Sequence, residues 1–522
     1  MRTLGFVFAC ALLLPVHEAV SQADETVAVV YEDVNRNETF DAGDQPLEDV
    51  LVSSLSEIRS TNAEGAATVP VEGRDIVFVI KPAGYALPLQ DHRVPDFYYL
   101  HYPNGTPADL KYPGVAPTGP LPDTLFFPMH PANHGKAITA NVVGDPQIPR
   151  KKENQIFRLE TVPELMGTNA DFGLFLGDIA DDNLDIFGPF EKSIRPLDMP
   201  LYMTYGNHDV NFRAPDNSLR AETYRRHFGP DYYSFNYGQS HFVVLNAVDY
   251  DGWDDEADER GSYFGGIDET QMEWFRQDIQ HVDPGVHIYI VAHIPLHDRF
   301  FATEDGKQIL EVVDDRDRVT HLSGHLHGFM SWTYDGDMFG TPMDARGYSL
   351  GATAGSWWAG PFEEDSVSAA TNTDGTPNGF FEFTFADTTH RWRFVPVGEP
   401  RDHQLRISTP HHTVPRDSLG HSPVVVNVFT GDERCEVVAR FDDRAEADTL
   451  TQFTGYDPFV LRTNHRRVNR DDWRPDPAKT GHLWKTALPR DLSPGTHVIR
   501  AIATCPEDKK YGERKVFEVI DE

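Results

Sequence analysis

The sequence predicts an α/β core with an all-β domain on each side of it. Apolar runs alternate with helical stretches through residues 131–398, whereas residues 22–130 and 399–522 hold the short alternating runs of β-strands. A chain of 522 residues is also too long for one hydrophobic core, so several domains are expected.

Residues 1–21 have the pattern of a secretory signal peptide. Arg2 supplies the positive charge, Leu4 to Leu14 the apolar segment, and Ala19 to Ser21 the small-residue cleavage site. The apolar segment is too short to cross a bilayer, and no later stretch is long and apolar enough to do so. We therefore expect an exported protein, periplasmic or extracellular, without stable membrane insertion.

Residues 22–130 are expected to form a β-sandwich and a linker. Strand-like runs cover residues 27–31, 50–53 and 76–80, and clusters of Gly, Asn and Asp separate them. Proline and glycine crowd residues 103–131, as is typical of a linker or a wrapping loop.

An acidic loop follows the first of these strands and resembles calcium-binding loops of bacterial surface β-sandwich modules. Its oxygen-bearing side chains occupy positions one, three, five, seven, nine and twelve of a calcium loop: Asp33, Asn35, Asn37, Thr39, Asp41 and Asp44. Position six is Glu38, where an EF-hand has glycine, and no helices flank the loop. Two interpretations stay open, a structural Ca²⁺ site and an Asx-rich hairpin turn without an ion.

Residues 131–398 alternate strand and helix signals. Strands are predicted at 137–143, 172–176, 242–245 and 286–291, and helices at 156–166 and 270–279. In open α/β sheets the loops at strand ends bind ligands, so polar residues in those loops are the candidates for function.

Polar clusters occur in one order along this region, and most follow a predicted strand. They are Gly144–Gln147, Gly177–Asp182, Gly206–Asp209, His293, and Gly324–His327. Their carboxylate, amide and imidazole groups are ligands for divalent metal ions. Two such ions held close together can generate a hydroxide and neutralise a phosphate, so the clusters predict a metal-dependent phosphoester hydrolase.

His208 is a further candidate because it adjoins an acid within these clusters. A histidine beside a carboxylate suits the general acid that protonates a leaving alkoxide. Asp209, its neighbour in the sequence, is expected to orient His208 or to raise its pKa.

The ordered clusters resemble those of the calcineurin-like metallophosphoesterase family, whose pattern is D-x-H, G-D-x-x-D, G-N-H-D/E, H and G-H-x-H. The resemblance covers roughly residues 138–394 and implies a β-sandwich of mixed sheets flanked by helices. It also implies that Asp145, Gln147, Asp178 and His327 hold one metal ion, and that Asp178, Asn207, His293 and His325 hold the second.

The resemblance assigns further roles around these ligands. His208 would contact the phosphoryl oxygens or protonate the leaving group, and Asp181 or Asp182 would hydrogen-bond a ligand or a metal-bound water. Gln147 stands where the family usually has histidine. An amide oxygen is a harder and weaker donor than imidazole, so Mn²⁺, Mg²⁺ or Fe is expected there in preference to Zn²⁺.

Two aromatic stretches near the clusters have two interpretations each. Trp357 and Trp358, between glycines, suit either a platform for a ring of the substrate or buried packing. The insertion between Asp209 and His293 is expected either to form a wall of the substrate site or to cap the sheet.

Residues 399–522 are expected to form a second β-sandwich. Strands are predicted at 424–428, 435–440 and 497–502, and the chain resembles a secreted bacterial branch of the family with extra Ig-like or prealbumin-like β-domains at both ends. Cys435 and Cys505 are the cysteines outside the signal peptide. In an exported protein they predict one disulfide, with two separate buried thiols as the alternative.

Charge limits the classes of partner. The formal net charge is -36, and a surface this acidic repels nucleic acid and anionic membranes.

The expected partner is a small phosphoester. Hydrolysis of phosphodiesters by a metal-bridging hydroxide is predicted first, because no cluster of arginines adjoins the motifs to bind a dianionic monoester. A phosphomonoesterase or protein phosphatase and a non-catalytic surface binding protein are the alternatives.

Overall fold

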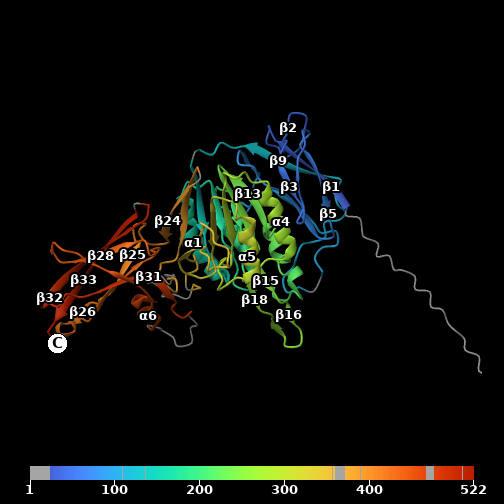
Figure 1. The fold of residues 1–522 in the computed structure, drawn as a ribbon. Coiled ribbons are helices and arrows are strands. Elements are labelled where there is room, and N and C mark those ends of the chain that lie inside the picture. Colours follow the sequence, from blue (N-terminus) through green and yellow to red (C-terminus); the bar gives the residue numbers. More distant parts are fainter. Residues whose placement is uncertain are drawn as a thin grey trace, which may run out of the picture.

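A computed structural model describes residues 24–107, 110–135, 137–355, 357–358, 371–387, 389–465, 475–507 and 509–521. The predicted signal peptide, residues 1–21, lies outside the described residues. Figure 1 shows a central layered body with helices beside it and strand-rich regions at both ends of the chain.

The N-terminal strands form two sheets. The first consists of β1 (Asp24–Glu32), β2 (Gln45–Pro46), β5 (Ala66–Val71), β7 (Tyr85–Ala86) and β9 (Thr124–Pro131). The second has the order β4 (Ile58–Ser60), β3 (Leu51–Ser53), β6 (Asp75–Val79) and β8 (Tyr98–His101). Each of the three strands predicted in this region is present.

Two larger sheets form the centre. One has the order β12 (Leu201–Met203), β11 (Phe172–Phe175), β10 (Ala137–Val143), β23 (Gly379–Ala386) and β24 (Thr389–Pro396). The other has the order β13 (Tyr233–Tyr237), β14 (Ser240–Leu245), β19 (His287–Ala292), β20 (Val319–Ser323), β22 (Arg346–Ser349) and β21 (Met330–Thr333).

The two central sheets pack face to face through aromatic side chains. Tyr202 of β12 stacks on Phe235 of β13 with ring centroids 3.7 Å apart, and Phe172 of β11 meets Phe242 of β14 edge-on at 5.3 Å. Strands β11, β14, β19 and β20 are buried along their whole length, as expected for parallel strands covered on both faces. The predicted mixed α/β core is therefore confirmed.

Helices accompany the central strands, and two of them overlap the helices predicted at residues 156–166 and 270–279. They are α1 (Lys151–Met166), α2 (Phe187–Ile194), α3 (Glu222–Phe228), α4 (Glu269–Gln280) and α5 (Thr303–Val312). Helix α1 begins five residues before its prediction, whereas α4 is close to it because Asp268 caps its first turn by accepting from Gln271 N. Helices α2, α3 and α5 were not predicted, since they are short and α2 contains a Gly-Pro pair.

The N-terminal strands share one hydrophobic core with the centre. Trp274 of α4 packs on Phe78 of β6 and donates from Nε1 to Ser53 Oγ at 2.9 Å. Lys81 is fully buried at the same junction, where Nζ donates to Asn236 O at 2.8 Å and lies 3.8 Å from the centre of the Tyr237 ring. The predicted domain boundary at residue 130 stays a prediction.

The C-terminal strands have a hydrophobic core of their own. One sheet has the order β25 (Leu405–Thr409), β27 (Pro423–Val428), β31 (Lys479–Ala487) and β30 (Thr451–Tyr456); the other has the order β26 (Thr413–Pro415), β33 (Lys509–Ile520), β32 (Gly495–Cys505), β28 (Glu436–Phe441) and β29 (Asp448–Thr449). A short helix, α6 (Pro458–His465), follows β30. Cys435 and Cys505 form the predicted disulfide, with an S–S distance of 2.06 Å.

Among the helices that the structure describes, none is long and apolar enough to cross a membrane.

Candidate metal centre

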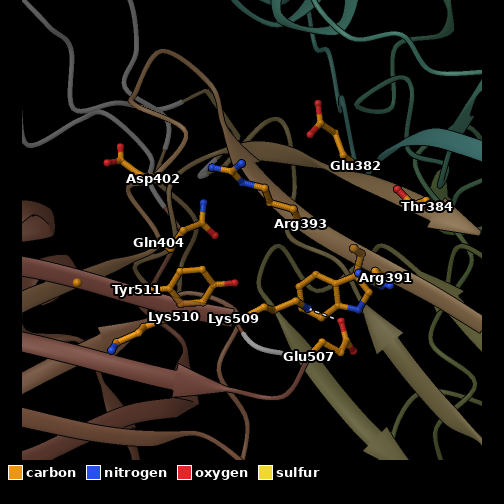
Figure 2. A pocket seen from close by; sticks show the side chains of 12 residues that line it. Glu382, Thr384, Arg391, Arg393, Asp402, Gln404, Glu507, Lys509, Lys510 and Tyr511 are labelled. Atoms are coloured by element: carbon orange, nitrogen blue, oxygen red, sulfur yellow. Dashed lines mark ion pairs between the residues drawn. The ribbon is translucent and has the colours of Figure 1, made fainter.

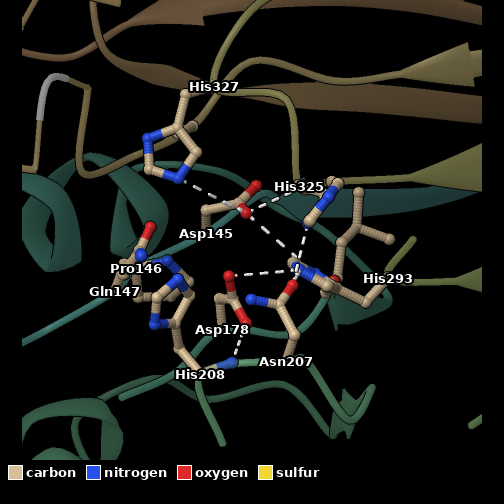
Figure 3. Close-up of polar contacts among 12 residues, drawn as sticks. Asp145, Pro146, Gln147, Asp178, Asn207, His208, His293, His325 and His327 are labelled. Atoms are coloured by element: carbon tan, nitrogen blue, oxygen red, sulfur yellow. Dashed lines mark hydrogen bonds and ion pairs between the residues drawn. The ribbon is translucent and has the colours of Figure 1, made fainter. Parts of the chain in front are cut away.

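The predicted metal ligands follow the carboxyl ends of parallel strands. Strands β10, β11 and β12 run parallel in one sheet, and β14, β19 and β20 run parallel in the other. Asp145, Asp178 and Asn207 follow the first three strands, and His293 and His325 follow β19 and β20. Because the carboxyl ends of parallel strands share one edge, the ligands from both sheets meet there, as Figure 3 shows.

The ligand loops have an unusual backbone. Asp145, Gln147, Asp178, His325 and His327 all have positive φ, between 36° and 74°. Non-glycine residues seldom adopt this region, and such strain is typical of functional sites. Glycines make room beside them: a Cβ on Gly324 would lie 2.6 Å from Asp145 Oδ2.

Four of the predicted ligands converge as one group. Asn207 Oδ1 lies 2.9 Å from His293 Nε2 and 2.8 Å from His325 Nδ1, and His293 Nε2 lies 3.1 Å from Asp178 Oδ2. Ligand atoms of Asp178, His293 and His325 all fall within 4.8 Å of one another. His293 Nδ1 donates to Leu176 O at 2.8 Å, which leaves Nε2 to face the other ligands.

The remaining predicted ligands adjoin this group, since Asp145 Oδ1 lies 4.0 Å from His293 Nδ1. His327 Nε2 is 3.7 Å from Asp145 Oδ1, and His327 Nδ1 donates to Gly355 O at 2.8 Å. Gln147 Nε2 donates to Asp181 Oδ1 at 3.3 Å, so Asp181 contacts the side chain of a predicted ligand.

Unpartnered oxygens show that this donor set fits a metal ion. Asp145 Oδ2 and Gln147 Oε1 are buried and have no hydrogen-bond partner. A buried polar oxygen without a partner is costly, and a bound cation would remove that cost.

Electrostatics keeps several ligands in the form that binds metal. Burial lowers the pKa of His325 to about 3 and that of His327 to about 4, so both imidazoles are neutral at pH 7. Burial opposes ionisation of Asp178, but His293 and His208 outweigh it and lower the pKa of this carboxylate. Asp145 is the exception: burial and the nearby Asp178 carboxylate raise its pKa to about 7, although His293 opposes the rise.

His208 lies beside these ligands and is held by acids. Its Nδ1 is 2.7 Å from Asp182 Oδ1 and 3.5 Å from Asp181 Oδ1, and its backbone N donates to Asp178 Oδ1 at 2.8 Å. Burial lowers the pKa of His208, but Asp178, Asp182 and Asp181 outweigh burial and raise it to about 9. His208 therefore carries a proton at neutral pH.

Asp209 has a different role from the one predicted. Its carboxylate accepts from the backbone N–H groups of Ile179, Ala180 and Gly206 at 3.2, 2.8 and 3.1 Å. It joins two ligand loops, and Asp182 orients the His208 ring in its place. Gly206 to Asp209 form a turn in which Asp209 N donates to Gly206 O at 3.1 Å, and the two adjacent side chains have different partners, so adjacency in sequence was a poor guide here.

Sequence reasoning missed Arg260, which lies in a hairpin of the insertion between Asp209 and His293. The hairpin pairs β16 (Trp253–Asp254) with β17 (Glu259–Arg260), between β15 (Val248–Tyr250) and β18 (Tyr263–Gly265). Arg260 Nη1 lies 3.0 Å from Asp182 Oδ2, and its guanidinium lies 4.8 Å from the centre of the Phe212 ring. No local pattern predicts this contact, because 78 residues separate the two partners.

The paired tryptophans lie against the ligand loops. Trp357 stacks on the ligand His327 with ring centroids 4.0 Å apart. Trp358 is 4% exposed and donates from Nε1 to Pro146 O at 3.0 Å, inside the loop that carries Asp145 and Gln147. Trp358 thus has the burial that the packing interpretation requires, and a substrate role for Trp357 stays a prediction.

The acidic loop after β1 is closed by its own hydrogen bonds. Asp33 accepts from the backbone N–H groups of Arg36, Asn37 and Glu38, and Asp44 accepts from those of Val34 and Asp41. Asn35 and Asn37 also donate to the Asp41 carboxylate. This is the geometry of an Asx-rich turn, and Ca²⁺ binding by the loop stays a prediction.

A cavity of about 570 Å³ lies between β24 and β33 and is separate from these ligands. Figure 2 shows charged side chains of both signs around it, with an ion pair between Lys509 and Glu507 at 3.1 Å. None of the predicted site residues lines it.

Comparisons with known proteins point to one family. Residues 139–329 match the family described as calcineurin-like phosphoesterase, and residues 347–511 match the description C terminal of calcineurin-like phosphoesterase. Purple acid phosphatase 15 of Arabidopsis thaliana is 25% identical over 213 residues, which are 33% of this chain and 37% of that protein. The match therefore spans little more than a third of that relative's length.

Solved structures give weaker likenesses. Purple acid phosphatase PPD1 from yellow lupin (Lupinus luteus) has a TM-score of 0.35 and 11% identity, over 72% of this chain and 67% of that one. The 5'-nucleotidase from Candida albicans has a TM-score of 0.26 and 11% identity, over 73% of this chain and 90% of that one. Because both TM-scores are low, neither structure supports a conclusion about this chain. The two family matches cover successive parts of this chain and together span most of it, so the chain belongs to the calcineurin-like metallophosphoesterase family.

Proposed function

We propose that this chain uses two divalent metal ions to hydrolyse small phosphodiesters. The observation that carries the proposal is the convergence of Asp178, His293 and His325 within 4.8 Å, with the buried, unpartnered oxygens of Asp145 and Gln147 in a neighbouring loop. Together with the other predicted ligands, a donor set of this size suits two ions held close together.

The ligand sets would be those predicted from the sequence. Asp145, Gln147, Asp178 and His327 would hold one ion, and Asp178, Asn207, His293 and His325 the other. When bound, such ions supply a nucleophile from water and neutralise charge on the phosphoryl oxygens. The amide of Gln147 favours Mn²⁺, Mg²⁺ or Fe over Zn²⁺ at the first position.

His208 would protonate the departing oxygen. Asp182 holds Nδ1–H at 2.7 Å, so the proton available to a substrate is on Nε2. Because the pKa of His208 is raised to about 9, that proton is present at neutral pH and can pass to the leaving alkoxide.

Phosphomonoesters are the second candidate substrate, and Arg260 favours them. A guanidinium beside Asp182 adds positive charge at the edge of the centre, where the sequence suggested no arginine. The relative named purple acid phosphatase points the same way. We do not retain the non-catalytic binding protein, because the chain belongs to a family of hydrolases and keeps the ligand set with His208.

Two chromogenic substrates separate these possibilities. With Mn²⁺ present, bis-p-nitrophenyl phosphate should be hydrolysed with a higher kcat/KM than p-nitrophenyl phosphate. The opposite order would establish the second candidate, and activity on neither would overturn the proposal. Metal analysis should find two ions per chain, and fewer would contradict the dinuclear site.

A variant of His208 tests its role separately. His208→Ala should lower kcat by about 10²–10⁴-fold, whereas His281→Ala, an exposed histidine at the end of α4, should leave it unchanged. An unchanged kcat in His208→Ala would remove His208 as the acid.

We also propose that the protein is exported and that residues 1–21 are removed. The disulfide between Cys435 and Cys505 supports this, because such bonds persist in oxidising compartments. Fractionation of the producing cell, with N-terminal sequencing of the mature chain, tests it. Recovery of the uncleaved chain in the cytosol would contradict export.

A further inference from the structure

A buried polar network joins the C-terminal strands to the centre of the protein. It consists of Asp374, Asn427, Asp457 and His482, which are all at most 3% exposed. Asp374 precedes β23, and Asn427 and His482 lie on β27 and β31. The network therefore crosses from one hydrophobic core to the other.

Hydrogen bonds hold His482 at both ring nitrogens. Its Nε2 lies 2.9 Å from Asp374 Oδ2, and its Nδ1 lies 2.8 Å from Asn427 Oδ1. The Asn427 amide is oriented by Nδ2, which donates to Asp374 O and to Asp457 Oδ2. The ring is thus held between two oxygens, one from each partner. His482 and Asp374 form a buried hydrogen-bonded pair.

The same aspartate holds the loop that carries two metal ligands. Asp374 Oδ2 also accepts from Phe329 N at 2.9 Å, two residues after the ligand His327. Thr373 Oγ1 donates to His327 O at 3.3 Å. Gly328 allows the loop to approach Asp374 closely, since a Cβ at this position would lie 2.8 Å from Asp374 Oδ2.

This loop depends on support from outside. His325 and His327 both have positive φ, a conformation that neighbouring contacts must maintain. Gly355 O orients the His327 ring, and the Asp374 carboxylate fixes the backbone that follows it. The orientation of Asp374 is in turn set by the ring of His482.

We propose that His482 is a positioning residue for the metal centre, and that the C-terminal strands complete the His325–His327 loop through the His482–Asp374 pair. The C-terminal region then contributes to metal affinity, although none of its side chains is among the proposed ligands. The inference rests on the proposed metal site.

His241 offers a matched control. It forms the same kind of buried pair, with Nε2 2.8 Å from Asp278 Oδ2 and Nδ1 2.9 Å from Asn236 Oδ1. Neither partner belongs to a ligand loop. His241→Gln and His482→Gln therefore make similar changes in a buried pair, and only the second touches the support of the metal loop.

The experiment measures Mn²⁺ binding to the full chain by titration calorimetry. Loss of a partner that orients metal ligands costs about 10–100-fold in affinity. His482→Gln should weaken Mn²⁺ binding by about that factor, with kcat largely recovered at saturating Mn²⁺, and His241→Gln should bind like the original protein. Equal affinity in His482→Gln and the original protein would overturn the inference, as would an equal loss in both variants.

Thr373→Val keeps the test available if His482→Gln does not fold. It removes only the hydroxyl that donates to His327 O and should weaken Mn²⁺ binding by a smaller factor, so unchanged affinity in this variant would also count against the inference. If the original protein binds no Mn²⁺, the proposed function fails. If it binds and the variants bind equally well, only the role of His482 fails.

Discussion

Replacement of Gly206 by alanine should disable the enzyme by steric displacement of Asp178. A Cβ on Gly206 would lie 2.1 Å from Asp178 N and 2.3 Å from Asp178 Oδ1. Since such contacts are not found below 3.0 Å, the two ligand loops must separate by about 0.9 Å. Gly206 does not have positive φ, so the effect arises from space alone.

The size of the effect follows from that displacement. A shift of about 1 Å in a reacting group can cost about 10²-fold in rate, which corresponds to about 2.7 kcal/mol. Forcing an extra methyl group into packed structure costs a further 1–3 kcal/mol or so of stability. We therefore expect kcat of Gly206→Ala to fall by about 100-fold or more, together with a lower melting temperature.

The assay is hydrolysis of the better chromogenic substrate at saturating Mn²⁺, with thermal melts alongside. Gly188→Ala is the control, because a Cβ there meets nothing within 4 Å and the residue lies in α2. Alanine is the better helix former, so this variant should be as active and slightly more stable. If Gly206→Ala keeps kcat within a few-fold of the original, the reasoning from close approach is wrong.

Further predictions concern the parts of the chain around the centre. Burial lowers the pKa of Lys81 to about 7, well below its unfolded value, so the unfolded chain binds the extra proton above pH 7. The free energy of unfolding should therefore rise with pH from about 7 towards 10 more steeply in the original protein than in Lys81→Met; parallel pH profiles in urea would contradict this. Replacing Cys435 and Cys505 by alanine should lower the melting temperature of the C-terminal region, because the bond closes a loop with a sequence separation of 70, and loops of that order are worth about 2–4 kcal/mol. Added Ca²⁺ should raise the melting temperature if the Asp33–Asp44 loop binds it, and the absence of any shift would leave the Asx-rich turn as the interpretation.

Local sequence patterns predicted part of the central sheets. The apolar runs at residues 137–143 and 286–291 appear as β10 and β19, within one or two residues of their predicted ends, whereas strands such as β12 and β20 were not predicted. Helix α4, which Asp268 caps, was also predicted closely. Short helices such as α3 were not, because seven residues give too little periodicity to distinguish a helix from a loop.

Contacts between side chains that are far apart in the sequence could not be predicted from it. The prediction that Asp209 orients His208 relied on adjacency, whereas the ring contacts Asp182, 26 residues earlier. Arg260 reaches the same carboxylate from an inserted hairpin, and nothing near it in the sequence signals a partner.

The sequence by itself determined which donors are present and in which order, and it placed several of them after predicted strands, because these depend on residue type and on short-range periodicity. The tertiary structure alone decided which carboxylate holds His208, that Trp358 is buried, and that His482 of the C-terminal strands supports the metal loop through Asp374. The physical reason is that hydrogen bonds and burial depend on where separate elements meet. Where these elements meet is determined by the packing of the two central sheets and of the C-terminal core. No local stretch of residues encodes that packing.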